Sequence, residues 1–289
     1  MTVSEMVAAK SPLDRLLDGY SAEVLARDRK GIAAAGALLP ADTEVSVTSL
    51  ANETADDLAG ACLALRRLGL TPVPHITART IPSRAALART LARLAAEAGV
   101  DRALVISGDV SKPVGEFDAA IQLIETGLFE ASGITRIALA VHPEGHPRVP
   151  DATMWAALPA KLKAAAEHGL EATLVSQFAF AAAPYIALAR RLRADGITQP
   201  LRVGVASPAK RTALIKYALI CGVGASLRAL RERHDLAANM AAGETPEALL
   251  RELAAAQAQE PTLGIDGVHF FTFGSLDGLV RLTETLRQG

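Results

Sequence analysis

The stretch Asp101–Asp109, DRALVISGD, contains the pattern on which the whole chain is built. Its residues Ala103–Ser107 are apolar and partly β-branched, which is typical of a buried strand in a parallel sheet. The run ends at Gly108 and Asp109, so a glycine that allows close backbone approach is followed by a carboxylate. In barrels and open sheets of alternating strands and helices, ligands bind at this carboxyl end of the strands. We therefore expect Asp109 to face a binding site.

Similar strand-like runs alternate with helical patterns along the entire chain. The expected strands are Tyr20–Leu25, Glu44–Thr48, Val73–Thr77, Ala103–Ser107, Arg136–Val141, Ala172–Phe178, Leu201–Ala206 and Val268–Phe273. The helical patterns between them include Thr54–Leu68, Ser83–Ala98, Asp151–His168, Pro184–Ala194 and Lys210–Ile220. Eight strands, each followed by a helix, predict an α/β protein with a (β/α)8 barrel rather than a doubly wound sheet.

No linker or low-complexity segment interrupts this alternation, so a single barrel is expected over residues 20–289, preceded by a helical extension over residues 1–19. The stretch Val223–Gln259 is unusually long and contains helical patterns at Ala225–Asn239 and Thr245–Gln259. An insertion before the last strand can shape a substrate lid or a subunit contact. An additional surface helix is the alternative.

Composition excludes several classes of function. The 289 residues are half hydrophobic and carry a formal net charge of -1, which gives no electrostatic basis for binding nucleic acid or an anionic membrane. No apolar run approaches the roughly 20 residues that span a bilayer. The N-terminus lacks the basic start and following apolar core of an export signal. Cys62 and Cys221 lie in apolar helical patterns and are expected to be inert thiols. These features predict a soluble cytoplasmic protein.

Polar residues follow or end most of the expected strands, and in a barrel they converge on one mouth. They are Glu23, Thr48, His75, Thr77, Asp109, His142, Glu144, His146, Gln177, Ser207 and Thr272. Glu23 stands between apolar neighbours, where burial would raise the pKa of its carboxyl and suit it to act as a general acid. A core glutamate with satisfied hydrogen bonds is the alternative, and His75 taken alone is more typical of a packing residue.

The stretch His142–Pro147, HPEGHP, places two histidines on either side of a glutamate. The helical zinc signature of similar composition needs its histidines on one helix face, and Pro143 and Pro147 disfavour a helix. A loop that hydrogen-bonds a ligand is therefore favoured over a metal site in the loop. The expected strands contain no lysine for a Schiff base, and neither a nucleophile elbow nor a glycine-rich dinucleotide fingerprint is present. Redox chemistry at this mouth would thus need a bound cofactor.

Five stretches occur together in the order and spacing of one family. They are PHIT at Pro74–Thr77, SGD at Ser107–Asp109, HPEGHP, VSQF at Val175–Phe178 and HFFTF at His269–Phe273. From about Tyr20 onward the chain therefore resembles the methylenetetrahydrofolate reductase family. The resemblance implies a barrel with non-covalent FAD that interconverts 5,10-methylenetetrahydrofolate and 5-methyltetrahydrofolate, with NADH or NADPH as the electron donor.

The resemblance also implies roles for individual residues. Glu23 matches the glutamate that supplies a proton when the methylene bridge opens, and Asp109 matches the aspartate beside the flavin ring and the pterin, so both would act in catalysis and contact the substrate. Gln177 matches the glutamine that hydrogen-bonds folate. The positions that match the surroundings of the flavin are Thr48, His75, Ile106, Ser107, Gly108, Asp109, Phe117, His142 and His146.

Several positions depart from the family's pattern. Ser107 stands where the family usually has arginine, and His142 where it often has tyrosine. The basic residues of the next helix are alanines here, so Lys161 or Lys163 is expected at the FAD pyrophosphate. Arg211 replaces an aromatic residue that stacks on the substrate, and a homo-oligomer is expected only by resemblance. Two alternatives stay open, a pterin-binding methyltransferase barrel with a corrinoid partner and a diverged barrel that has lost the chemistry.

Overall fold

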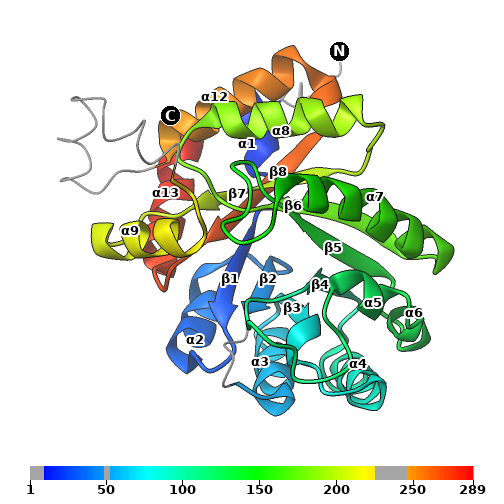
Figure 1. The fold of residues 1–289 in the computed structure, drawn as a ribbon. Helices are drawn as coiled ribbons and strands as arrows, with labels where there is room; N and C mark the ends of the chain where they lie inside the picture. Colours follow the sequence, from blue (N-terminus) through cyan, green and yellow to red (C-terminus); the bar gives the residue numbers. More distant parts are fainter. Residues whose placement is uncertain (1–9, 49–52, 225–245, 289) are drawn as a thin grey trace, which may run out of the picture.

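A computed structural model of the chain describes residues 10–48, 53–224 and 246–288. Eight parallel strands close into a barrel in sequence order (Figure 1). The strands are β1 Ser21–Leu25, β2 Glu44–Thr48, β3 Thr71–Thr77, β4 Arg102–Ile106, β5 Arg136–Val141, β6 Glu171–Ser176, β7 Leu201–Ala206 and β8 Ile265–Phe271. The barrel closes where Ser21 and Ala22 of β1 pair with His269 and Phe270 of β8. The predicted single (β/α)8 barrel is therefore confirmed.

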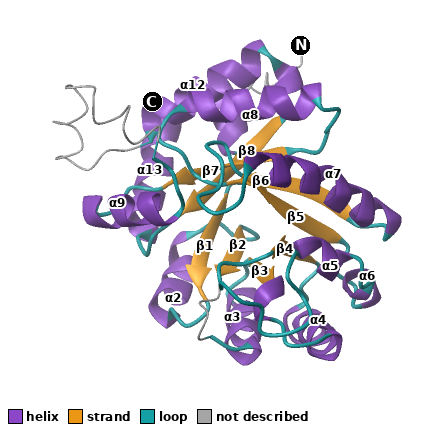
Figure 2. Ribbon diagram, in the orientation of Figure 1, coloured by secondary structure: helices purple, strands orange, loops and turns teal. Residues whose placement is uncertain are grey.

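Helices surround the barrel and cover the outer face of the sheet (Figure 2). They are α1 Pro12–Leu17, α2 Arg29–Leu38, α3 Ala55–Arg67, α4 Arg84–Ala98, α5 Ala120–Ile124, α6 Leu128–Ala131, α7 Asp151–Glu167, α8 Ala182–Ala194, α9 Arg211–Ile220, α12 Glu247–Gln259 and α13 Leu276–Gln288, with the 3-10 turns η1 Ala78–Thr80 and η2 Pro261–Leu263. In the long stretch before the last strand, α12 corresponds to the second helical pattern, whereas the pattern at Ala225–Asn239 lies outside the described residues.

The core lies between the sheet and the helices. In β4, Ala103 and Val105 are buried while the alternate residues of the strand stay partly exposed. The apolar face of α4 packs into the same core through Leu87 and Leu91, which are fully buried. Because successive side chains of a strand point to opposite faces, the buried set faces the helices and the alternate set faces the barrel axis. The axis-facing positions are thus the ones that can reach a ligand.

The amino-terminal ends of the strands are joined by a network of charges. Glu44 at the start of β2 binds Arg102 of β4, and its other oxygen lies 2.6 Å from Arg202 of β7. Asp101 binds Arg102 at 2.9 Å and also pairs with Arg136 of β5. These side chains tie four strands together at the end of the barrel opposite the mouth. The network leaves the carboxyl ends as the open side of the fold.

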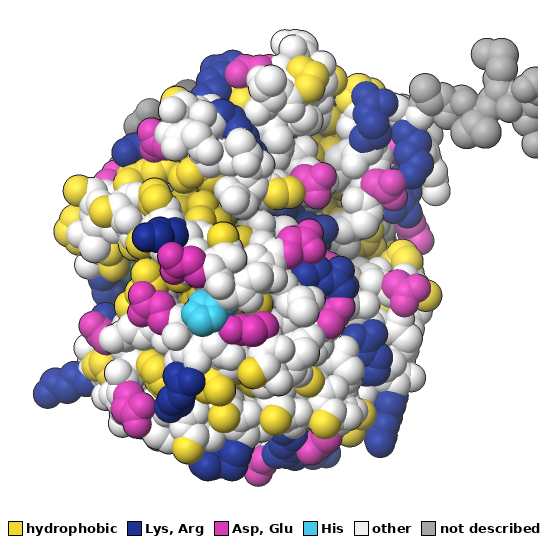
Figure 3. Space-filling view, turned by 90° about the vertical axis from the view of Figure 1, so that its right-hand side faces the viewer, with side chains coloured by type: hydrophobic (Ala, Val, Ile, Leu, Met, Phe, Trp, Pro, Cys, Tyr) yellow, Lys and Arg dark blue, Asp and Glu magenta, His cyan; other side chains and the backbone are white. Residues whose placement is uncertain are grey.

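The outer surface carries charges of both signs. On the face shown in Figure 3, acidic and basic side chains are interspersed and no large area has a single sign. None of the helices in the described ranges is long and apolar enough to cross a membrane.

Candidate active site

Glu23 of β1 lies in a polar cluster at the barrel axis. Its Oε2 is 3.5 Å from the Thr48 hydroxyl of β2 and 3.9 Å from Nε2 of His269 in β8. The Thr48 hydroxyl is in turn 3.4 Å from Nδ1 of His75 in β3. The Glu23 side chain is only 18% exposed. Barrel closure therefore places one sequestered carboxyl group between two histidines.

His269 is a site residue that the sequence presents only as the first letter of the motif HFFTF. Its Nδ1 lies 2.9 Å from the Ser21 hydroxyl, and both residues are buried. Because this contact orients the ring, Nε2 faces Glu23. The Ser21 hydroxyl, the His269 imidazole and the Glu23 carboxylate thus lie next to one another, with His269 as a polar neighbour of Glu23. The sequence signal for His269 is a histidine within the otherwise apolar run Val268–Phe271.

One ring nitrogen of His75 has no partner within the described part of the chain. If the Thr48 hydroxyl donates to Glu23, it must accept from Nδ1 of His75, which leaves Nε2 as an acceptor. That Nε2 is buried and has no hydrogen-bond partner among the described residues. Burial lowers the pKa of His75 to about 4. The charge of Glu23 opposes this shift, and His269 adds to it. His75 is therefore a neutral hydrogen-bonding group at physiological pH.

We expect acid to destabilise this fold through His75 and His142, which the fold keeps neutral. The pKa of His75 and that of His142 both fall to about 4, below the value of about 6.5 in an unfolded chain. The unfolded chain therefore binds protons first as the pH falls, so this stability is fully present above pH 6.5 and is lost towards pH 4. The neutral state of each histidine would contribute up to about 3 kcal/mol to the free energy of unfolding.

The measurement is urea unfolding at pH 7 and pH 4.5 for the wild-type protein and His75→Gln. The variant should lose less unfolding free energy on acidification because one neutral buried histidine is gone. An identical loss in both proteins would contradict a neutral His75.

Asp109 lies outside this cluster, in the loop after β4. Its side chain is 82% exposed and pairs with Arg148 from the loop after β5. Gly108 adopts a φ of +94°, and a Cβ there would lie 2.1 Å from Cγ2 of Thr77, so the close approach to β3 requires glycine. The Ser107 hydroxyl accepts a hydrogen bond from the Ala120 N–H at 3.1 Å. Ser107 and Gly108 thus shape the loop that carries Asp109.

The remaining predicted residues of this loop are apolar. Ile106 ends β4 and stays partly exposed towards the barrel axis, whereas Phe117 is buried. Ile106 is therefore placed to contact a ligand, and Phe117 packs beneath the loop.

The β5 side of the mouth carries two histidines and a lysine. The rings of His142 and His146 meet edge to face with centroids 5.1 Å apart. Burial lowers the pKa of His142, with His146 and Lys161 adding to the effect. Burial also lowers the pKa of Lys161, which has no ion pair or hydrogen bond among the residues that the structure describes. A sequestered lysine without a partner suits an anionic ligand.

Lys163, the alternative lysine, lies elsewhere. Its side chain is 78% exposed, and its Nζ is 3.7 Å from Oε1 of Glu167 on the same helix. The two lysines are two positions apart on α7, so the helix turns them to different sides. The structure thus places Lys161 near the mouth and Lys163 towards solvent.

Aromatic rings gather at the ends of β6 and β8. Phe178, after β6, meets Phe271 and Phe273 at centroid distances of 5.5 and 5.4 Å, and Phe273 stacks on Tyr217 of α9 at 4.6 Å. Phe273 has a φ of +46°, a strained conformation for a residue other than glycine. Such flat, apolar surfaces can pack against a ring system of a ligand.

Two predicted substrate-binding positions lie at this aromatic side. The Gln177 N–H donates to the Val141 carbonyl at 2.8 Å, and its Oε1 accepts from the Phe178 N–H at 3.0 Å. These bonds leave the two donors of its amide group available. Arg211 is the first residue of α9, and its side chain lies outside the described part of the structure.

The hydroxyl groups of two more strand-end residues differ in whether they already make a hydrogen bond within the protein. The Thr272 hydroxyl donates to the Glu23 main-chain carbonyl at 2.9 Å, so it helps to close β8 onto β1. The Ser207 hydroxyl, directly after β7, is buried and has no hydrogen-bond partner within the described ranges. The Thr272 hydroxyl thus uses its proton in a bond within the barrel, whereas the Ser207 hydroxyl can form a hydrogen bond with a ligand.

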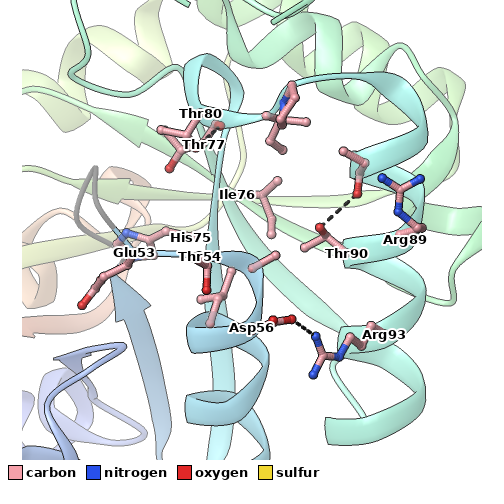
Figure 4. A pocket seen from close by; sticks show the side chains of 15 residues that line it. Glu53, Thr54, Asp56, His75, Ile76, Thr77, Thr80, Arg89, Thr90 and Arg93 are labelled. Atoms are coloured by element: carbon pink, nitrogen blue, oxygen red, sulfur yellow. Dashed lines mark hydrogen bonds and ion pairs between the residues drawn. The ribbon is translucent and has the colours of Figure 1, made fainter. Parts of the chain in front are cut away.

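A cavity of about 520 Å³ leads from the end of β3 outward between α3 and α4 (Figure 4). His75, Ile76 and Thr77 line its inner part, while Asp56 of α3 pairs with Arg93 of α4 farther out. The walls are of mixed charge. Within the described residues, no three histidine, cysteine, aspartate or glutamate side chains gather as metal ligands.

Comparison with known proteins agrees with the fold and the motifs. The family model described as methylenetetrahydrofolate reductase matches residues 33–281. An uncharacterized protein from Clostridium thermocellum, which binds two copies of 5-methyl-5,6,7,8-tetrahydrofolic acid, has a TM-score of 0.57 at 10% identity, with 96% of this chain and 98% of that chain covered. Dihydropteroate synthase from Thermus thermophilus has a TM-score of 0.47 at 15% identity, with 95% of each chain covered. At 10% identity, the likeness to the Clostridium thermocellum protein shows the fold alone.

Proposed function

The chain belongs to the methylenetetrahydrofolate reductase family, and on this premise we propose that it is an FAD-dependent oxidoreductase that interconverts 5,10-methylenetetrahydrofolate and 5-methyltetrahydrofolate with NADH or NADPH. The membership itself makes it a folate-related barrel enzyme. The observation that supports the finer proposal most directly is the sequestered Glu23 between His75 and His269. A barrel of the same fold from Clostridium thermocellum binds a reduced folate, so the architecture can accommodate this class of ligand.

The residues at the mouth fit FAD. Thr48 and His75 would lie at the flavin ring, where the free Nε2 of His75 can accept a ligand N–H. His142, His146 and Lys161 would hold the pyrophosphate, since Lys161 has no other anionic partner in the described ranges. FAD, when bound, supplies a ring that can take up hydride from a nicotinamide and pass it to folate.

Glu23 would handle the proton of the folate reaction. Opening the five-membered methylene ring needs a proton on the departing nitrogen, and closing it needs that proton removed. The Glu23 side chain is 18% exposed, so it is partly accessible yet shielded from bulk water, and His269 lies beside it. Asp109, Gln177 and the aromatic rings would contact the pterin and its substituents. Two substrates that share one face of the flavin would give ping-pong kinetics.

We expect the purified protein to be yellow and to release FAD, not FMN, on heat denaturation. Lys161→Gln should weaken FAD binding about 10- to 100-fold, because a hydrogen bond to a charged group contributes about 1.5–3 kcal/mol. Lys163→Gln, a change of the same chemistry on the solvent side of α7, is the matched control and should bind FAD like the wild type. The measurement is flavin absorbance and fluorescence titration of the apoprotein.

A colourless protein that takes up no added FAD would contradict the proposal. Methyl transfer from 5-methyltetrahydrofolate to a corrinoid would then favour the methyltransferase alternative, and the lack of either activity would favour a diverged barrel. The homo-oligomer, the cytoplasmic location and the choice between NADH and NADPH stay predictions.

A further inference from the structure

Arg148 connects two loops at the mouth of the barrel. It lies in the loop between β5 and α7, and its guanidinium reaches Asp109 in the loop after β4. Nη2 donates to the Asp109 carboxylate, and Nη1 donates to the Asp109 main-chain carbonyl at 3.0 Å. The side chain therefore holds Asp109 at both its carboxylate and its backbone.

The loop that carries Arg148 is itself organised. The Arg148 N–H donates to Nδ1 of His146 at 3.1 Å, and the His146 ring packs against His142, which directly follows β5. Gly145 has a φ of +81°, and a Cβ at this position would meet the Asp151 carboxylate at 2.9 Å. The backbone of Arg148 is thus linked, through His146, to His142 at the end of β5.

Among the described residues, Arg148 is the one basic side chain bound to Asp109. In the described ranges, its side-chain hydrogen bond and its ion pair are those with Arg148. The residue before the Gly108–Asp109 turn is Ser107, whose hydroxyl accepts from the Ala120 N–H and offers no charge. Exposed ion pairs usually contribute little unless their geometry is favourable. A two-point contact between anchored loops is such a geometry.

We propose that Arg148 is a positioning residue for Asp109, which it holds at the mouth through contacts with the carboxylate and the main-chain carbonyl. This inference rests on the proposed function for the role of Asp109 in the folate reaction. Arg148 acts through Asp109 and has no role of its own toward the reacting atoms.

A double-mutant cycle tests the inference in the folate half-reaction, measured by stopped-flow flavin absorbance. Arg148→Gln should slow that half-reaction about 10-fold, a coupling typical of residues in contact. In an Asp109→Asn background the same change should have no further effect. Arg148→Lys should restore part of the rate, because it keeps the charge but not the two-pronged geometry. An equal loss in both backgrounds would overturn the inference.

Arg190→Gln provides the matched control. Arg190 binds Glu260 through Nε at 3.0 Å and Nη2 at 2.7 Å, and its side chain is 62% exposed. The change removes an exposed two-pronged ion pair that lies between α8 and the end of α12. The control should leave both half-reactions unchanged, which separates positioning from the general loss of a surface contact.

A second readout needs neither flavin nor folate. Burial, together with the charges of Asp109 and Glu23, raises the pKa of Cys221 to about 11. Removing the Asp109 charge should therefore speed iodoacetamide labelling of Cys221 at pH 9 by about two- to five-fold, the size expected for a solvent-screened charge interaction. Peptide mass spectrometry distinguishes Cys221 from Cys62, which is fully buried.

In the Arg148→Gln background, Asp109→Asn should change the labelling rate less, because the carboxylate is no longer held in one place. The same acceleration in both backgrounds would overturn the positioning role. If the coupling is present in a protein that never reacts with folate, the proposed function fails while the inference about Arg148 holds.

Discussion

Glu23→Gln should nearly abolish reaction with both folates while leaving flavin reduction by NADH or NADPH intact. General acid–base assistance contributes about 10²–10⁴-fold, so a loss of that size is expected in the folate half-reaction. Hydride transfer between two planar rings needs no such proton. Glutamine has the shape of glutamate and can keep the contacts with Thr48 and His269, so the variant should fold and bind FAD.

The two half-reactions are measured separately by stopped-flow flavin absorbance, together with the melting temperature. Glu44→Gln is the matched control, since Glu44 is bound by Arg102 and Arg202 at the opposite end of the barrel. That change should lower stability and leave the ratio of the half-reactions unaltered. A stable Glu23→Gln enzyme with an undiminished folate half-reaction would remove Glu23 from the mechanism.

Asp109→Asn should slow the folate half-reaction by about 10²–10³, the cost of losing one preorganised electrostatic contact. The carboxylate would stabilise positive charge that develops on folate, whereas it would contribute less to the arrival of hydride from nicotinamide. Because the side chain is exposed, the substitution should change the free energy of unfolding by no more than about 0.5 kcal/mol.

Stopped-flow measurements of both half-reactions, with urea unfolding of the same preparation, test this role. Equal losses in the two half-reactions would show that Asp109 serves flavin binding in general. A large loss of stability would show that its pairing with Arg148 matters mainly for the fold.

The barrel could be predicted from the sequence because the signals are local. Each strand is a short run with a polar residue at or near its end, and each of the eight predicted strands overlaps one in the structure. The boundaries of β2, β5 and β7 agree with the prediction, and those of the other strands differ by a few residues. The sixth strand ends at Ser176, so Gln177 and Phe178 lie beyond it, and β8 begins at Ile265, before the expected Val268. Boundaries depend on pairing with neighbouring strands, which a local pattern does not contain.

Part of the candidate site was predictable for the same reason. Glu23, Thr48 and His75 are polar residues on neighbouring strands, and parallel pairing brings such residues to one side of a barrel. The structure places the three side chains together. Their chemical roles stay predictions until the variants are measured.

Strand periodicity and chain order are local properties, so they were sufficient to predict the fold, the open end of the barrel and the polar residues at its mouth. The partners of those residues came from tertiary structure. Closure of β8 onto β1 brings His269 to Ser21 and Glu23, although Ser21 and His269 are 248 positions apart. The packing of α7 decides that Lys161 is sequestered while Lys163 faces solvent. The conformations of two loops bring Arg148 to Asp109. Such contacts depend on long-range packing, which no single stretch of the chain encodes.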